Sequence, residues 1–338
     1  MDTGIIKKTN IKAVIEALMQ VGEVIAPVRK DDYLVFSPLS SADAACLDYA
    51  NSKLSPKGCF FPQTEVLFTY EKEGHKTFEP PREAKPGFIV GIRPCDSRAL
   101  ALLDPIFDER QYHDVYYLEK RKSKTVIGLA CNEPQSTCFC TSTGGNPSDT
   151  AGMDMLWQNL GDRYLVRPVT SRGRELMAQL PHIEEAGQDD LARAQEQGEK
   201  ALSKLPPVFS ADEVADKLSS SFDDSLWQKI YEKCLGCATC AFVCPTCHCF
   251  DIQDENRSGQ GRRVRLWDSC QFPLFTLHTS GHNPRPCGKE RVRQRVMHKF
   301  NYFKVNNGQV ACVGCGRCIR ECPVNMDIRQ IVSAYSVK

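Results

Sequence analysis

Two cysteine runs near the C-terminus constrain this chain more than any other feature of its sequence. The first is Cys234-x2-Cys237-x2-Cys240-x3-Cys244-Pro, and the second is Cys312-x2-Cys315-x2-Cys318-x3-Cys322-Pro. In this spacing three thiolates hold one [4Fe–4S] cube and the fourth crosses to a second cube. Small residues between the cysteines let backbone N–H groups approach the sulfurs. The pair of runs therefore predicts a two-cluster site.

The crossover rule assigns four ligands to each cluster. Cluster one takes Cys234, Cys237, Cys240 and Cys322, and cluster two takes Cys312, Cys315, Cys318 and Cys244. Structural zinc normally uses four ligands in two separated Cys-x2-Cys hooks, so eight cysteines in two four-cysteine runs favour iron–sulfur. A disulfide framework is disfavoured, because the chain is long and its N-terminus lacks the apolar core of an export signal.

Four further cysteines predict a third [4Fe–4S] cluster. Cys95 follows the apolar run Gly87–Ile92, Cys131 follows Thr125–Ala130, and Cys138 and Cys140 come shortly afterwards. Parallel buried strands bring their carboxyl ends to one edge of a sheet, where open α/β sheets bind ligands. The alternative is that these four are inert buried thiols. The sequence leaves open the role of Cys247, Cys249, Cys270 and Cys287.

Composition excludes several functional classes. The chain has 338 residues, with 43 basic and 42 acidic side chains and a net charge of +1, which argues against a nucleic-acid-binding surface. No apolar run approaches the ~20 residues that span a bilayer. Eighteen cysteines without an export signal predict a cytoplasmic protein that uses its cysteines as ligands.

The chain is expected to form two domains. Residues 1–205 predict an α/β domain with a partly parallel sheet, the additional cluster site and a helical tail. Residues 206–338 predict a mainly α-helical, ferredoxin-like two-cluster domain with a long, helix-prone insert between the two half-motifs. The elements expected in the first domain are helices at 11–20, 97–107, 154–160 and 171–180, and strands at 23–29, 33–37, 87–92, 125–130 and 164–169.

No motif for an organic cofactor or for catalysis stands out. The sequence has no Gly-x-Gly-x-x-Gly after a strand, no P-loop and no hydrolase motif. The chemistry on the substrate is therefore assigned to another subunit, and whether this chain is itself an enzyme stays uncertain. A basic run over Arg285–Lys299 fits a solvated helix face, a docking surface for an acidic redox partner, or electrostatic support for the clusters.

The cysteine-rich stretches resemble those of a known family. They are Cys234–Cys249, Trp267–Cys270, Ser280–Pro286, Cys312–Cys318, Arg93–Asp96 and Thr137–Ser142. The chain is similar to the 4Fe–4S dicluster proteins, the family of the sulfhydrogenase beta chain and of the corresponding iron–sulfur component of anaerobic sulfite reductase. This resemblance implies a cytoplasmic electron-transfer subunit in a hetero-oligomer. Its partners would be a catalytic module of hydrogenase, sulfite reductase or heterodisulfide reductase type and a flavin-containing, NAD(P)H-binding subunit.

Two other functions remain open from the sequence. One is a self-contained reductase whose N-terminal domain carries a flavin or deazaflavin. The other is a DNA-processing iron–sulfur protein, which the balanced charge disfavours. The donor, the acceptor, the direction of electron flow, the cluster potentials and the stoichiometry of the complex are not encoded in any recognisable motif.

Overall fold

The computed structural model describes residues 2–71, 85–257 and 259–336. The chain divides into two compact units that interleave along the sequence. The units are Met1–Phe60 with Glu83–Pro206 and Val313–Cys315, and Phe61–Arg82 with Pro207–Cys312 and Gly316–Lys338. Each unit therefore contains a short segment that is distant in sequence from the rest of it.

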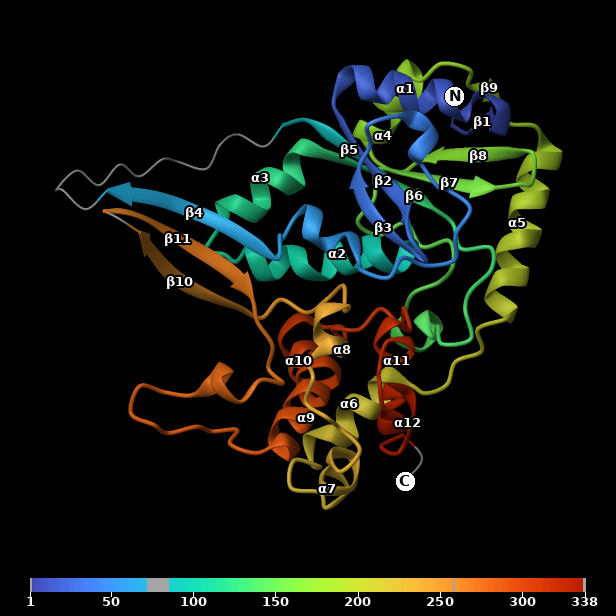
Figure 1. Ribbon diagram of the computed structural model, residues 1–338. Helices are drawn as coiled ribbons and strands as arrows, with labels where there is room; N and C mark the ends of the chain where they lie inside the picture. Colours follow the sequence, from blue (N-terminus) through green and yellow to red (C-terminus); the bar gives the residue numbers. More distant parts are fainter. Residues whose placement is uncertain (1, 72–84, 258, 337–338) are drawn as a thin grey trace. The chain divides into compact units, whose positions relative to one another are not determined.

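The first unit is built on an eight-stranded mixed sheet with the order β3-β2-β5-β6-β7-β8-β1-β9 (Figure 1). The strands are β1 (Gly4–Lys7), β2 (Glu23–Lys30), β3 (Tyr33–Pro38), β5 (Gly87–Ile92), β6 (Lys124–Leu129), β7 (Met155–Asn159), β8 (Arg163–Pro168) and β9 (Glu184–Glu185). Strands β2, β5, β6 and β7 are parallel, and the remaining neighbours are antiparallel. The expected partly parallel sheet is thus present.

Helices cover both faces of this sheet. They are α1 (Ile11–Val21), α2 (Pro94–Phe107), α3 (Val115–Ser123), α4 (Ser171–Gln179) and α5 (Gln188–Ser203). Helices α1 and α4 contribute to the core that contains Ile6 and Val166, whereas α5 packs against Ile5 and Leu165. Because successive strand residues point to opposite faces, α5 lies on the face opposite to α1 and α4.

The central strands β5 and β6 are buried on both faces of the sheet. All six residues of β5 and all six of β6 are buried, which is typical of parallel strands covered by helices. The predicted helix at 154–160 is wrong, because this segment forms β7 between β6 and β8. Its Met, Leu and Gln residues favour a helix, but Met155 and Trp157 alternate into the core of the sheet. Tertiary packing has overridden local propensity here.

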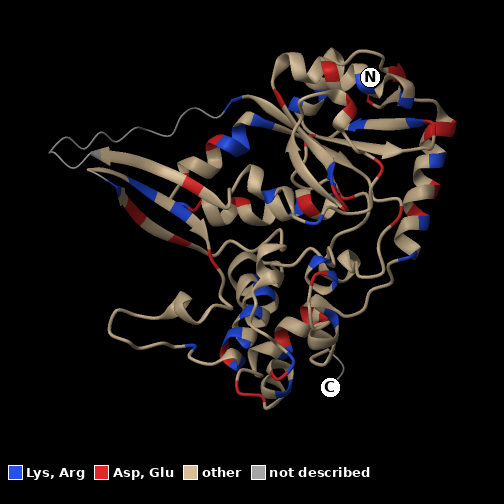
Figure 2. Cartoon of the chain, viewed as in Figure 1, with Lys and Arg blue, Asp and Glu red and all other residues tan. Residues whose placement is uncertain are grey.

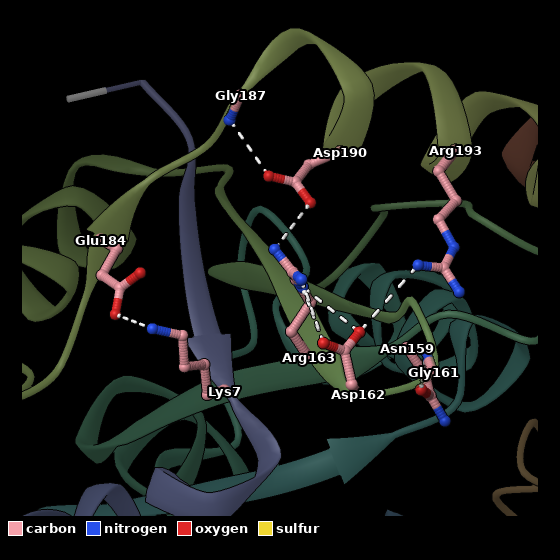
Figure 3. Close-up of polar contacts among 9 residues, drawn as sticks. All are labelled: Lys7, Asn159, Gly161, Asp162, Arg163, Glu184, Gly187, Asp190 and Arg193. Atoms are coloured by element: carbon pink, nitrogen blue, oxygen red, sulfur yellow. Dashed lines mark hydrogen bonds and ion pairs between the residues drawn. The ribbon is translucent and has the colours of Figure 1, made fainter.

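Ion pairs connect the β1–β8–β9 edge of the sheet to α5 (Figure 3). Lys7 pairs with Glu184 at 2.7 Å, which joins β1 to β9. Arg163 on β8 reaches Asp190 on α5 at 3.5 Å. These pairs are largely solvent-accessible, so each is expected to contribute no more than about 1 kcal/mol.

The second unit combines a three-stranded antiparallel sheet with short helices. The sheet has the order β10-β11-β4, from β4 (Thr64–Glu71), β10 (Phe250–Arg257) and β11 (Gln260–Trp267). The helices are α6 (Ala211–Ser219), α7 (Leu226–Tyr231), α8 (Thr239–Phe242), α9 (Gly288–Met297), α10 (Phe303–Asn307), α11 (Arg317–Arg320) and α12 (Ile328–Ser333). A π-helical turn, His298–Tyr302, joins α9 to α10. The mainly helical character expected for this part is not confirmed, because the spacer between the cysteine runs carries the β10–β11 hairpin as well as helices.

Helix α6 begins with a side-chain cap. The Ser210 hydroxyl accepts a hydrogen bond from the backbone N–H of Glu213 at the start of α6. None of the helices in the described part of the chain has the length and apolarity needed to cross a bilayer.

Candidate metal centres

The two cysteine runs share one backbone conformation, although most of their intervening residues differ. Gly236 and Ala238 in the first run have φ of 67° and 61°, and Gly314 and Gly316 in the second have φ of 61° and 73°. These left-handed residues occupy equivalent positions, and α8 and α11 begin immediately after them. The repeat of a left-handed turn at matching sites indicates two loops shaped for the same purpose.

The four cysteines predicted for cluster one line a single cavity in the second unit. They are Cys234, Cys237, Cys240 and Cys322. Backbone N–H groups point at two of their sulfurs: Gly236 donates to Cys234 Sγ at 3.4 Å, and Met326 donates to Cys322 Sγ at 3.2 Å. N–H groups directed at thiolate sulfur are the donors that stabilise cluster charge. This donor set fits a [4Fe–4S] cube.

Three of the four cysteines predicted for cluster two, namely Cys244, Cys312 and Cys318, belong to the second unit, and Cys315 belongs to the first. Cys244 and Cys312 are buried. Cys244 Sγ lies 3.2 Å from the Thr246 hydroxyl and 3.3 Å from Lys299 Nζ. A hydrogen bond from Cys247 lowers the pKa of Cys244 well below its usual value, which favours the ligating thiolate form.

The four cysteines predicted for cluster three also line one cavity, in the first unit. Cys95 lies in the first turn of α2, directly after β5, and Cys131 follows β6, so two neighbouring parallel strands deliver them to the same edge. Cys138 precedes a 3-10 turn that begins at Cys140. Burial raises the pKa of Cys140 to about 12 and also raises the pKa of Cys131. These thiols are therefore neutral unless a metal binds them.

The loop of this third set packs against part of the second cysteine run, a contact that no feature of the sequence indicates. Phe139 N–H donates to the Gly314 carbonyl at 2.8 Å, and the Asn51 amide donates to the Cys315 carbonyl at 3.2 Å. Cys138 Sγ lies 3.9 Å from the same Cys315 carbonyl. Within the first unit, the third cysteine set therefore adjoins one predicted ligand of cluster two.

Two buried cations lie among the cysteines of the second unit. Arg295 lines the same cavity as the cluster-one cysteines, and Lys299 contacts Cys244. Burial opposes the charged form of Lys299, but the thiols of Cys244 and Cys247 raise its pKa above the usual value. The basic run was visible in the sequence, but which of its members are buried depends on helix register, which tertiary packing sets.

The remaining cysteines of the second unit form no obvious ligand set. Cys249 and Cys270 meet at the open end of the β10–β11 hairpin, where Asp268 N–H donates to the Cys249 carbonyl. A hydrogen bond from Cys249 lowers the pKa of Cys270 to about 6. Cys287 is exposed at the start of α9. Among the described residues, no three His, Cys, Asp or Glu side chains are grouped to hold a single metal ion.

Comparison with known proteins agrees with this geometry. Residues 233–326 match the model of the 4Fe-4S dicluster domain. The beta chain of sulfhydrogenase 2 of Pyrococcus furiosus is 34% identical over 315 residues, which cover 92% of this chain and 91% of that protein. The B component of the selenate reductase of Mesobacillus selenatarsenatis is 26% identical over 168 residues, or 45% of this chain and 53% of that protein. No matching solved structure was found.

The first relative is similar over nearly the whole length of both chains, so the relationship includes the α/β unit as well as the cysteine runs. The chain therefore belongs to the 4Fe–4S dicluster family of iron–sulfur electron-transfer proteins that includes the sulfhydrogenase beta chain.

Proposed function

We propose that this chain carries electrons through three [4Fe–4S] clusters inside a cytoplasmic multi-subunit oxidoreductase. On one side would be a flavin-containing, NAD(P)H-binding subunit, and on the other a catalytic module of hydrogenase, sulfite reductase or heterodisulfide reductase type. The observation that carries this proposal is the cavity lined by Cys234, Cys237, Cys240 and Cys322, with N–H groups directed at two of the sulfurs. When bound, such clusters exchange single electrons at potentials between about −700 and +450 mV.

Proposed ligands of cluster two neighbour each of the other two cysteine sets. The third set adjoins Cys315, a proposed ligand of cluster two. Cys318, another proposed ligand of cluster two, lines the cavity of the cluster-one set. Within each unit, the cysteine set that the unit contains therefore has a proposed ligand of cluster two as a neighbour.

The test is to count iron and sulfide in anaerobically purified protein. About twelve irons per chain are expected for three cubes, and about eight would remove the N-terminal one. Cys131→Ser is expected to lose about four irons, whereas Cys46→Ser, in the same unit but outside the third set, should keep them all. Colourless protein that contains zinc would contradict the proposal as a whole.

A flavin in the N-terminal unit is the second candidate function, and one cavity favours it. This cavity of about 480 Å³ lies at the carboxyl ends of β6 and β7, where α/β sheets bind ligands. Polar side chains that line it include Asp48, Arg93, Asn132, Glu133, Gln197 and Lys200. Arg93 also lines the cavity of the third cysteine set, so a ligand here would adjoin that set.

The two functions differ in what the isolated chain contains. A yellow, fluorescent compound released by acid from the purified chain would support the flavin hypothesis. A brown protein that releases no flavin would leave the purely electron-carrying function.

A further inference from the structure

Arg295 and Lys299 are two basic side chains that the fold buries on consecutive turns of one helix. Arg295 lies near the end of α9 and is 9% exposed, and Lys299 lies in the following π-helical turn and is 4% exposed. Figure 2 shows that basic residues recur along α9. Burying a cation costs several kcal/mol unless an anion accompanies it. In the described part of the chain, neither side chain forms an ion pair with a carboxylate.

The contacts of Lys299 point to the anion it accompanies. Its Nζ donates to Cys244 Sγ at 3.3 Å, to the Thr246 hydroxyl at 3.0 Å and to the Ala311 carbonyl at 3.1 Å. These three bonds use all three ammonium protons. Only the Cys244 sulfur among the three acceptors can bear negative charge. Lys299 is thus held against Cys244, a proposed ligand of cluster two. It also contacts Ala311, which directly precedes Cys312, another proposed ligand of that cluster.

Arg295 occupies a different position, between the two ligand sets. It lines the cavity that contains the cluster-one cysteines, and Cys318, a proposed ligand of cluster two, lines the same cavity. Its Nη2 donates to the Cys240 carbonyl at 3.2 Å. Its Nε is buried and, among the described residues, has no hydrogen-bond partner. This N–H can therefore donate a hydrogen bond to a group bound in the cavity.

We propose that Lys299 and Arg295 raise the reduction potentials of the C-terminal clusters, Lys299 acting on cluster two and Arg295 on both. This inference rests on the proposed function. One-electron reduction adds one negative charge to a cluster and takes no proton from either side chain. A fixed cation in a poorly solvated site stabilises the reduced form more than the oxidised form. Cluster two, with two such cations, is the centre that accepts an electron first.

The π-helical turn supports a specific role for Lys299. Such turns are rare and occur frequently at functional sites. Here the turn changes the register of the helix after α9, and Lys299, Phe300 and Asn301 are all buried within it. The local geometry thus directs an ammonium group into the protein rather than into solvent.

The experiment is a potentiometric titration of the full-length protein, followed anaerobically by electron paramagnetic resonance, with iron counted in every sample. Lys299→Met keeps the length of the side chain and removes the charge. It is expected to lower one midpoint so that the oxidised-to-reduced ratio at the wild-type midpoint rises about tenfold, equivalent to 59 mV for a one-electron couple. Arg295→Met is expected to lower two midpoints. Lys289→Met, which removes a less buried charge from the same helix, is the control and should titrate as wild type.

Each outcome decides between the alternatives. Variants that keep their iron and titrate like Lys289→Met would overturn the inference while leaving the proposed function standing. Wild-type protein without iron–sulfur clusters would instead overturn the proposed function. If Lys299→Met loses iron, Lys299→Arg is the deciding variant. Recovery of iron and of the wild-type midpoint supports a requirement for charge, and failure to recover contradicts it.

Discussion

His298 is a buried histidine that borders the basic side chains of the second unit. Burial, followed by the nearby charges of His248, Lys299 and Arg285, lowers the pKa of His298 from 6.5 to about 4. Its ring packs edge-on against His248, with 5.4 Å between centroids. The folded protein therefore keeps this imidazole neutral at pH values where the unfolded chain would protonate it.

This difference predicts a loss of stability in mild acid. The pKa of His298 is lower in the folded state than in the unfolded chain. Its contribution to the free energy of unfolding is therefore fully present above about pH 6.5. That contribution is lost as the pH falls towards 4, because the unfolded chain then binds a proton that the folded protein does not. By pH 5 the loss is about 2 kcal/mol. His298→Gln is expected to flatten the fall in melting temperature between pH 7 and pH 5, measured anaerobically by circular dichroism. The control is His282→Gln, at an exposed site, and a variant curve that overlays it would contradict the prediction.

At the scale of single residues, the sequence predicted candidate ligands but not what surrounds them. The spacing of the runs was enough to group Cys234, Cys237 and Cys240 with the distant Cys322, because the spacing itself reflects cluster geometry. Lys299 was visible only as one member of a basic run. Its burial depends on a π-helical turn, and such a turn has no spacing or composition that marks it in the chain.

Among the structural elements, the two cysteine loops provide a matched pair of glycines. Gly236 and Gly314 occupy the same motif position and have φ of 67° and 61°. A Cβ on Gly236 would meet no atom within 4 Å, whereas a Cβ on Gly314 would lie 2.4 Å from Cys140 N. The two positions therefore share a left-handed backbone conformation but differ in available space.

Alanine substitution should separate these two effects. Gly236→Ala is expected to cost about 1–2 kcal/mol from left-handed strain alone. Gly314→Ala adds an overlap with the backbone at Cys140 and should cost more, with loss of iron from the third set. Melting temperatures and iron contents of the two variants, compared side by side, test this. Equal effects in both variants would show that the packing of Gly314 against the Cys138–Cys140 loop contributes nothing to stability or to iron binding.

Elements with a strong apolar signal could be predicted from the sequence, and polar ones could not. Strands β5 and β6 were predicted because each contains a short, mostly apolar run. The β10 strand is exposed along its whole length, and only Phe250 and Ile252 among its residues are apolar, so its strand signal is weak. Strand β4 pairs with β11, and a pairing between segments so far apart leaves no local signal.

At the scale of the whole molecule, one buried ion pair joins these distant segments. Glu65 on β4 and Arg265 on β11 are 8% and 3% exposed and form an ion pair at 2.5 Å. The Arg265 guanidinium also lies over the rings of Phe61 and Phe250, at 5.1 and 5.5 Å. Removing one partner of such a pair leaves the other charge buried.

Glu65→Gln is therefore expected to destabilise the second unit by about 3–5 kcal/mol. The double variant Glu65→Gln with Arg265→Met should recover part of this loss, because it removes the uncompensated charge as well. Unfolding in denaturant, monitored anaerobically, would measure both values. A single variant as stable as the wild type would mean that the pair is of no consequence for the sheet.

The interleaving of the two units has a consequence for biosynthesis. The first unit includes Val313–Cys315, which are made long after the rest of that unit, and the second takes β4 from a segment made long before the rest of it. Neither unit can therefore be completed before these distant segments have both been made, although domains usually mature in order from the N-terminus. We expect iron delivery to await synthesis of the second cysteine run, so that the thiols made earlier need protection from oxidation in the meantime.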